Sequence, residues 1–507
     1  MRTRAHALGF QFLSEVKHSV ILHVGRDESS GPSCGGLLVF FAAAAVIARV
    51  FFWAYTGRVW DDSLIALTSA RNFWDGFGLT HHASEPRVYS FTSAIGELIL
   101  VAGEGFGQGL LITKLVSILA AVATIYSAYR IGIVLSFGWA SHVLVLTYLS
   151  LDHLQIFFGM AGMETQVATA LILASVYCYL VSRWTPLGIT LGLAVLVRPE
   201  FWLWAVILGV VLLVSNRGAF YRVAALAAAV ALPWFVFAEL YFGSIIPHTV
   251  AAKSAVFARR PFAPIAAIRQ ACFDWWANIA PFRQYWAAPE APVHDIVLKI
   301  VVLVLVTLAG VGVYRAWRAR HSLIAVAVFV AGFALYRTLS VTGNYHMWYL
   351  TPFMALLFII AGFGLSMPRL GRIRAPVAVT LACCYAGHLP FTLPLDRLVQ
   401  EEIEVGMLTR VGRTLNSIMG PTDTAVLEPM GRIGWEARNK TIYDYPGLTS
   451  RVSLDALAPG AAISDLIVAL SPTFAVLRPG ELDDLARRFP HVSRQYTPLV
   501  RITPERP

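Results

Sequence analysis

The sequence predicts an α-helical polytopic membrane protein of about eleven transmembrane helices, followed by a small C-terminal α/β domain. The chain has 507 residues, of which 57% are hydrophobic and 14% are charged, and its mean hydropathy is +0.64. Apolar runs recur along the chain at the length that a bilayer crossing requires. After residue 394 they give way to short β-like runs that alternate with helical ones, a pattern typical of a small α/β unit.

The charge pattern points to a membrane as the main partner. The formal net charge is +10, and most basic residues are Arg in short gaps between apolar runs. Such gaps set the topology of a membrane protein and favour anionic headgroups. No basic face with interleaved aromatic residues is visible, so nucleic acid is not expected as a partner. The five cysteines lack zinc or disulfide-framework spacing and are expected to be small core residues.

The chain begins with a basic stretch that differs from a signal peptide. Residues 1–35 lack an apolar core followed by a small-residue cleavage site, so we expect a cytoplasmic N-terminal tail. Residues 36–56 then form an uncleaved first span. Two adjacent carboxylates, Asp61 and Asp62, follow where that helix should emerge into water, and we expect them on its last turn.

The polar loop that follows ends in a short helix. Residues 92–106 are apolar but contain two glutamates and are short for a crossing, which indicates an interfacial helix. The run Ser90-Phe91-Thr92-Ser93 is expected to cap it. The further spans are predicted at residues 110–135, 137–158, 165–181, 187–197, 201–214, 219–242, 296–314, 323–341, 347–366 and 375–393.

The distribution of Arg sets the predicted topology. With the N-terminus in the cytoplasm, most Arg-rich gaps fall on the cytoplasmic side, and the Asp pair falls outside. The predicted organisation is a tail at 1–35, a transmembrane domain at 36–394 with outer loops 57–106 and 243–294, and an extracytoplasmic α/β domain at 395–507.

The C-terminal domain should begin with an amphipathic helix and continue with alternating strands and helices. The helix is expected at 397–419, the strands at Thr424–Leu427, Thr441–Tyr443, Phe474–Leu477 and Leu499–Ile502, and further helices near 464–470 and 481–488.

The Asp pair is the strongest candidate for chemistry. Adjacent helical residues point about 100° apart, so both carboxylates cannot face one small ligand equally. One could be a general base and the other a structural or metal partner. A carboxylate at an apolar rim can have a raised pKa and accept a proton from a hydroxyl. The alternative is that both residues only mark the membrane edge.

Neighbouring polar residues offer partners for an anion. Arg71 and Arg87 could bind phosphate through bidentate hydrogen bonds. His81 and His82 could donate to a leaving oxygen or, with the Asp pair, ligate a divalent metal. No ligand spacing demands a metal, so no cofactor is assigned.

Three more outer-face segments carry polar candidates. Arg198 could contact a phosphate, or it could pair with Glu200 to close a helical hairpin. Lys253 offers a point charge to an anion. His346 could be a ligand or a proton donor, or an ordinary residue of the membrane interface.

These features together resemble the GT-C class of polytopic glycosyltransferases. The resemblance is clearest in Asp61-Asp62-Ser63 and in residues 70–82, and it covers most of residues 36–480. Its bacterial branch includes terminal arabinofuranosyltransferases and lipopolysaccharide-modifying transferases. The stretches that carry it are ARNFWDGFGLTHH, YSFTSAIGELIL, LVRPEF, IPHTVAAKS, YHMWYLTPF and EPMGRIGWEARNKTIYDYPGLTS.

The resemblance implies a reaction and a location. A sugar would pass from a polyprenyl-phosphate donor to a glycan or lipid acceptor of the cell envelope, on the non-cytoplasmic face of a bacterial plasma membrane. Asp62, or else Asp61, would be the general base. The donor phosphate would be bound by Arg71, Arg198, Lys253 and His248. The acceptor or sugar pocket would include Tyr89, Glu200, Tyr345 and His346.

Two other classes of protein compete with this interpretation. A transporter or flippase of lipid-linked sugars would need ionisable residues deep inside its spans, whereas here the charges cluster at helix ends. A non-catalytic envelope assembly protein would use the C-terminal domain as a binding module and would not depend on the Asp pair.

Overall fold

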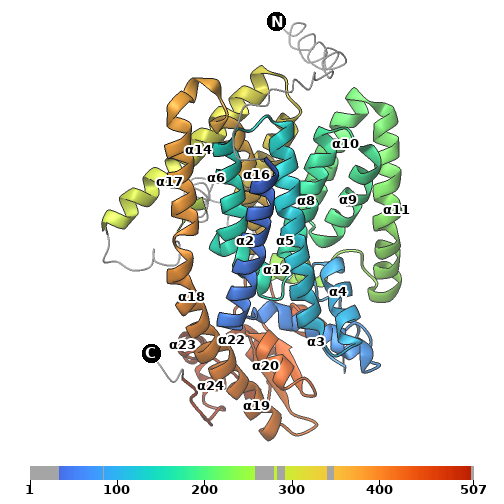
Figure 1. Ribbon diagram of the computed structural model, residues 1–507. Helices are drawn as coiled ribbons and strands as arrows, with labels where there is room; N and C mark the ends of the chain where they lie inside the picture. The colour runs from blue at the N-terminus through green and yellow to red at the C-terminus, as the bar shows by residue number, and fades with distance from the viewer. Residues whose placement is uncertain (1–33, 84, 257–278, 282–291, 340–346, 504–507) are drawn as a thin grey trace, which may run out of the picture.

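The computed structural model describes two connected parts, a bundle of long helices and a smaller C-terminal unit at one end of it (Figure 1). The predicted sites Tyr345 and His346 lie outside the described residues, as do residues 1–33 and most of the loop after α12. The described residues are 34–83, 85–256, 279–281, 292–339 and 347–503.

The first part is helical throughout its described length. Its elements are α2 (Cys34–Thr56), α3 (Asp61–Trp74), α4 (Ala94–Glu104), α5 (Gly109–Val134), α6 (Trp139–Leu151), α7 (His153–Met160), α8 (Thr165–Leu180), α9 (Trp184–Val197), α10 (Phe201–Ser215), α11 (Arg217–Phe242), α12 (His248–Val256), α14 (Pro292–Arg318), α15 (Leu323–Leu339), η3 (Met347–Tyr349), α16 (Thr351–Leu365), η4 (Pro368–Ile373), α17 (Arg374–Ala386) and α18 (Leu389–Leu398).

The predicted helical membrane architecture is confirmed. Within the described residues, six helices are long and apolar enough to cross a membrane, and five further apolar helices are shorter. The total of about eleven spans therefore stays a prediction. The six long helices are Gly35–Thr56, Gly109–Val134, Trp139–Met160, Arg217–Phe242, Ile296–Arg318 and Pro368–Ile418.

Small residues let the central helices approach closely. A Cβ atom at Gly312 of α14 would lie 2.1 Å from the carbonyl oxygen of Ile360 in α16. One at Gly364 of α16 would lie 2.0 Å from the carbonyl oxygen of Leu308. Side chains larger than hydrogen cannot fit at these positions, so this contact depends on backbone packing, as is common between membrane helices.

A buried arginine ties the first span to the bundle. Arg49 of α2 is fully buried, and its guanidinium donates to the Gln166 side chain at 2.7 Å and to the carbonyl groups of Ala45, Leu149 and Ser150. Because a buried charge is costly unless its donors are used, this bonding identifies Arg49 as a structural residue.

The start of the polar region differs from the prediction. The expectation that Asp61 and Asp62 end the first span is wrong, because α2 stops at Thr56 and both residues open the separate helix α3. Gly57 adopts a φ of +61°, a left-handed conformation that terminates α2 at little cost. Carboxylates in a first turn are stabilised by the helix dipole.

The short interfacial helix is present as α4. Its N-cap residue is Ser93, whose hydroxyl accepts a hydrogen bond from the backbone N–H of Gly96 at 3.0 Å, so the predicted capping role is confirmed. Both α3 and α4 lie at the end of the bundle nearest the C-terminal unit (Figure 1).

The C-terminal unit contains a three-stranded parallel sheet in the order β2-β1-β3, with Thr424 beside Thr441 and Ala425 beside Phe474. The strand predicted at Leu499–Ile502 is wrong, because those residues pair with no described strand. The elements are η5 (Val399–Leu408), α19 (Thr409–Ile418), β1 (Thr424–Leu427), α20 (Met430–Glu436), β2 (Thr441–Asp444), α21 (Arg451–Ala456), α22 (Ile463–Leu470), β3 (Phe474–Ala475), α23 (Pro479–Arg488) and α24 (Pro490–Ser493).

Helix α3 joins the two parts. The Asp61 carboxylate accepts hydrogen bonds from the backbone N–H groups of Gly431 (2.9 Å) and Arg432 (2.6 Å) at the start of α20. Ile65, one turn further along α3, packs into the apolar core of the C-terminal unit. Only glycine fits at position 431, because a Cβ atom there would lie 1.9 Å from the Asp61 carbonyl oxygen.

We expect Asp61→Ala to loosen the C-terminal unit from the bundle. Each backbone N–H left without an acceptor costs about 1–3 kcal/mol. Limited proteolysis and thermal unfolding in detergent should both show earlier opening near α20. The control is Asp455→Ala, which removes an exposed acid of the same unit. Equal behaviour of the two variants would contradict this role for Asp61.

Candidate functional site

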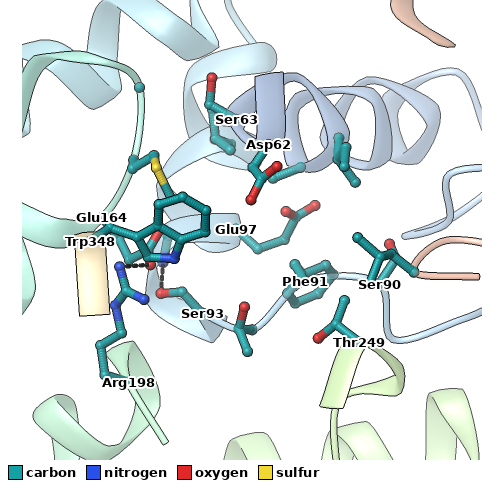
Figure 2. A pocket seen from close by; sticks show the side chains of 18 of the residues that line it. Asp62, Ser63, Ser90, Phe91, Ser93, Glu97, Glu164, Arg198, Thr249 and Trp348 are labelled. Atoms are coloured by element: carbon teal, nitrogen blue, oxygen red, sulfur yellow. Dashed lines mark hydrogen bonds and ion pairs between the residues drawn. The ribbon is translucent and has the colours of Figure 1, made fainter. Parts of the chain in front are cut away.

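A cavity lies between the C-terminal unit and the ends of the helices nearest to it. Its empty volume is about 730 Å³, and Leu448 of the C-terminal unit forms part of its wall. Figure 2 shows the polar side chains that point into it, from several elements far apart in the sequence. The residues that line it include Asp62, Ser90, Phe91, Glu97, Thr113, Glu164, Arg198, Thr249, Lys253 and Tyr349.

Different helices supply the charged groups. Asp62 comes from the first turn of α3, and Glu97 from the first turn of α4. Arg198 follows the last residue of α9, and Lys253 lies in α12. Tyr349 ends the short helix η3. The cavity thus brings together three of the sequence-predicted residues, Asp62, Arg198 and Lys253.

Asp62 is surrounded by protein although the cavity leaves it partly accessible. Burial raises the pKa of its carboxyl to about 6, and the nearby positive charge of Lys253 opposes that rise. The negative charges of Asp61 and Glu164 add to the rise. Asp62 is therefore largely ionised at neutral pH but close enough to its pKa to exchange a proton.

Three cations gather around the Tyr349 ring. The Lys253 ammonium donates to the Tyr349 hydroxyl at 3.2 Å, and the Arg198 and Arg337 guanidinium carbons each lie 5.3 Å from the ring centroid. Arg198 also pairs with Glu164 at 2.9 Å. Lys253 and Arg198 thus place two cationic side chains of the cavity wall beside one ring, an arrangement suited to an anion.

Two predicted phosphate ligands lie elsewhere. Arg71 forms ion pairs with Asp75 at 3.5 Å and Glu104 at 3.6 Å and lines a separate depression. His248 is not among the cavity residues, because its side chain faces the backbone of Gly447 and Ser450 in the C-terminal unit. The structure therefore does not bring either side chain to Asp62.

The predicted pocket residues Tyr89 and Glu200 also lie outside the cavity wall. The Tyr89 hydroxyl accepts a hydrogen bond from the Trp234 indole at 2.8 Å within an aromatic cluster. Glu200 is the residue before α10. Arg198 pairs with Glu164, so the predicted alternative of a hairpin-closing pair with Glu200 is not what the structure shows.

The candidate metal ligands face other partners. Asp61 binds the backbone of α20, and the His82 ring lies 3.0 Å from the Thr449 hydroxyl. His81 is buried beside His82. In the parts of the chain that the structure describes, no three His, Cys, Asp or Glu side chains are grouped closely enough to hold a metal.

Sequence reasoning missed three residues of the cavity. Glu97 was assigned only to an interfacial helix, although an acid in an apolar helix is itself a functional signal. Glu164 follows Gly162-Met163 between two apolar runs, at the same end as Arg198. Tyr349 stands in an aromatic run, and no pattern in the sequence could show that cations surround it.

Comparisons with known proteins support this architecture. No family model matches the chain. A terminal β-(1→2)-arabinofuranosyltransferase of Corynebacterium glutamicum is 28% identical over 267 residues. The match covers 45% of this chain and only 38% of the length of that relative.

Solved structures show the same fold. The apo crystal structure of ArnT from Cupriavidus metallidurans matches with a TM-score of 0.55 at 14% identity, over 90% of this chain and 95% of that one. The same protein bound to undecaprenyl phosphate matches with a TM-score of 0.50 at 15% identity, over 81% of this chain and 86% of that one. The chain is a polytopic membrane protein with the GT-C fold, and the resemblance inferred from its sequence is confirmed at that level.

We expect Asp62→Asn to stabilise the protein. Burial disfavours the charged form of Asp62, so replacing it with a neutral amide should raise the free energy of unfolding by up to about 3 kcal/mol at neutral pH. The folded-state pKa is raised, so the gain should be absent below about pH 4 and complete above about pH 6.

Thermal unfolding in detergent at pH 4 and at pH 7.5 measures this difference. The matched control is Asp75→Asn, which alters a more exposed acid directly after the same helix and should change stability little. A lower midpoint for Asp62→Asn at pH 7.5 would contradict the proposed strain at this position.

Proposed function

We propose that this protein transfers a sugar from a polyprenyl-phosphate donor to a glycan or lipid acceptor of the cell envelope. The observation that carries the proposal is the cavity in which a carboxylate with a raised pKa faces a cluster of cations. A general base and an anion site in one enclosed space are what inverting transfer from a phosphate-linked donor requires.

The arrangement assigns a role to each end of the cavity. The Asp62 carboxylate takes the proton of the acceptor hydroxyl, whose oxygen attacks the anomeric carbon of the sugar. The bond between that carbon and the phosphate oxygen breaks, and the electron pair leaves with the phosphate. Lys253 and Arg198 stabilise the negative charge that develops there.

The names of the similar proteins agree with this chemistry. The Corynebacterium relative is named an arabinofuranosyltransferase, and one ArnT structure holds undecaprenyl phosphate. By analogy, the donor here carries a polyprenyl chain that lies in the bilayer, with its phosphate at the cations. We propose no donor sugar from the likeness alone.

The proposed location follows from the reaction and the charge pattern. The protein would lie in a bacterial plasma membrane with its N-terminal tail in the cytoplasm. The cavity and the region after residue 394 would face the other side, where envelope acceptors are found.

A transporter of lipid-linked sugars is less well supported. Its hallmark would be an ionisable residue along a path through the bundle. The fully buried Arg49 is the obvious candidate, but its guanidinium is bonded to Gln166 and to backbone carbonyls. A residue held in this way cannot easily release one ligand for another.

We expect Asp62→Asn to lower transfer at least a hundredfold while the protein still folds, because an amide cannot accept the proton. The measurement is transfer of radiolabelled sugar from polyprenyl-phosphate donors in membranes, with Asp75→Asn, directly after the same helix, as the control. Normal transfer by Asp62→Asn would remove Asp62 from the mechanism. If the variant with alanine at both Asp61 and Asp62 kept its full function, a non-catalytic assembly protein would be favoured.

We expect Lys253→Met to raise the KM for the donor about tenfold or more, since it removes a charged hydrogen-bond donor from the anion site. Arg71→Met should change it by no more than about twofold, because Arg71 lies outside the cavity. Donor titration with each variant separates the two sites. A larger increase in the donor KM for Arg71→Met than for Lys253→Met would contradict a phosphate site beside Tyr349.

A further inference from the structure

The cavity contains polar groups that the reaction described above does not use. Glu97 is 1% exposed, and neither of its carboxyl oxygens has a hydrogen-bond partner in the described residues. The hydroxyl oxygens of Ser90 and Thr249, both buried, also lack partners there. All three residues line the same cavity (Figure 2).

Such groups are unusual in a folded protein, because a buried polar atom without a partner costs about 1–3 kcal/mol. Glu164, another acid of the cavity wall, binds Arg198 at 2.9 Å. Glu97 differs from Glu164 in that both of its carboxyl oxygens are available to a ligand.

The free groups lie apart from Arg198. In Figure 2, Ser90, Phe91 and Thr249 lie on the opposite side of the cavity from Arg198 and Glu164, and the Asp62 and Glu97 carboxyl groups lie between. With a phosphate bound at Arg198, the side of Ser90 and Phe91 receives the part of the ligand that carries no charge.

We propose that Glu97, Ser90 and Thr249 form the subsite that binds the hydroxyl groups of the transferred sugar. Sugar hydroxyls both donate and accept hydrogen bonds, and they match a set of two hydroxyls and a carboxyl group. The Phe91 ring on the same wall offers an apolar surface for a sugar face. The inference rests on the proposed transfer reaction and adds the orientation of the donor.

The two carboxyl groups of the cavity then have different tasks. Burial raises the pKa of Glu97 well above its usual value, and the nearby Ser69 hydroxyl acts in the opposite direction. The raised pKa favours the protonated carboxyl group, which can donate a hydrogen bond to a sugar oxygen and accept another. Asp62, whose pKa is about 6, remains the group that takes a proton.

The experiment measures lipid binding without any acceptor. Wild type is first tested with decaprenyl phosphate and with decaprenyl phosphates that carry arabinofuranose, mannose or glucose, and the sugar lipid that it binds most tightly is then used for every variant. The readout is the dissociation constant of decaprenyl phosphate divided by that of the chosen sugar lipid, since this ratio isolates the contribution of the sugar.

Glu97→Leu should lower that ratio about tenfold or more, because a subsite made for hydrogen bonding discriminates strongly. Decaprenyl phosphate itself should bind within about twofold of wild type. Glu97→Gln, which can still donate and accept, should keep most of the preference. Ser90→Ala and Thr249→Val should each lower it by a smaller factor.

Thr113→Val is the matched control. Thr113 lines the same cavity, but its hydroxyl donates to the Gly109 carbonyl at 2.9 Å, so the preference should persist. An unchanged ratio in Glu97→Leu, or an equal loss for both lipids, would overturn the subsite. Wild type that binds decaprenyl phosphate without preferring any sugar lipid would overturn the subsite alone. Wild type that binds neither lipid would overturn the proposed function as well.

Discussion

The break between α2 and α3 is the constraint on which the site depends. Because α2 ends at Thr56 and α3 starts anew at Asp61, the two adjacent carboxylates leave the first turn of a helix in different directions. Asp61 binds the backbone of α20 and holds the C-terminal unit in place. Asp62 faces the cavity that this unit helps to enclose.

This arrangement couples folding to chemistry. Leu448 of the docked C-terminal unit contributes to the cavity wall, so the cavity is complete only when the two parts are in contact. Enclosure strengthens the attraction between Lys253 and Asp62 and raises the pKa of the carboxyl to about 6. The cost of burying the charged carboxylate of Asp62 is what brings its pKa near neutral pH, where it can exchange protons.

The two sides of the cavity differ in chemistry. Arg198 and its partner Glu164 lie on one side, and the uncharged hydroxyl groups of Ser90 and Thr249 lie on the other. In the proposed reaction, the donor would bind with its phosphate at Arg198 and its sugar beside Glu97, which would place the anomeric carbon near Asp62. The two acids of the cavity would then have different proposed roles, Glu97 as a hydrogen-bonding group and Asp62 as the base.

The sequence by itself determined the helical membrane architecture, the α4 helix with its Ser93 cap and three of the four predicted strands, and it predicted Asp62 as a candidate base. Those features follow from local hydrophobicity, helix capping and strand pattern, which neighbouring residues fix. Tertiary structure alone decided that Asp61 is an anchor, that Arg71 and His248 stand apart from Asp62, and that Glu97, Glu164 and Tyr349 share its cavity. Contacts between elements hundreds of residues apart set a side chain's partners and burial, and these depend on packing that no local pattern records.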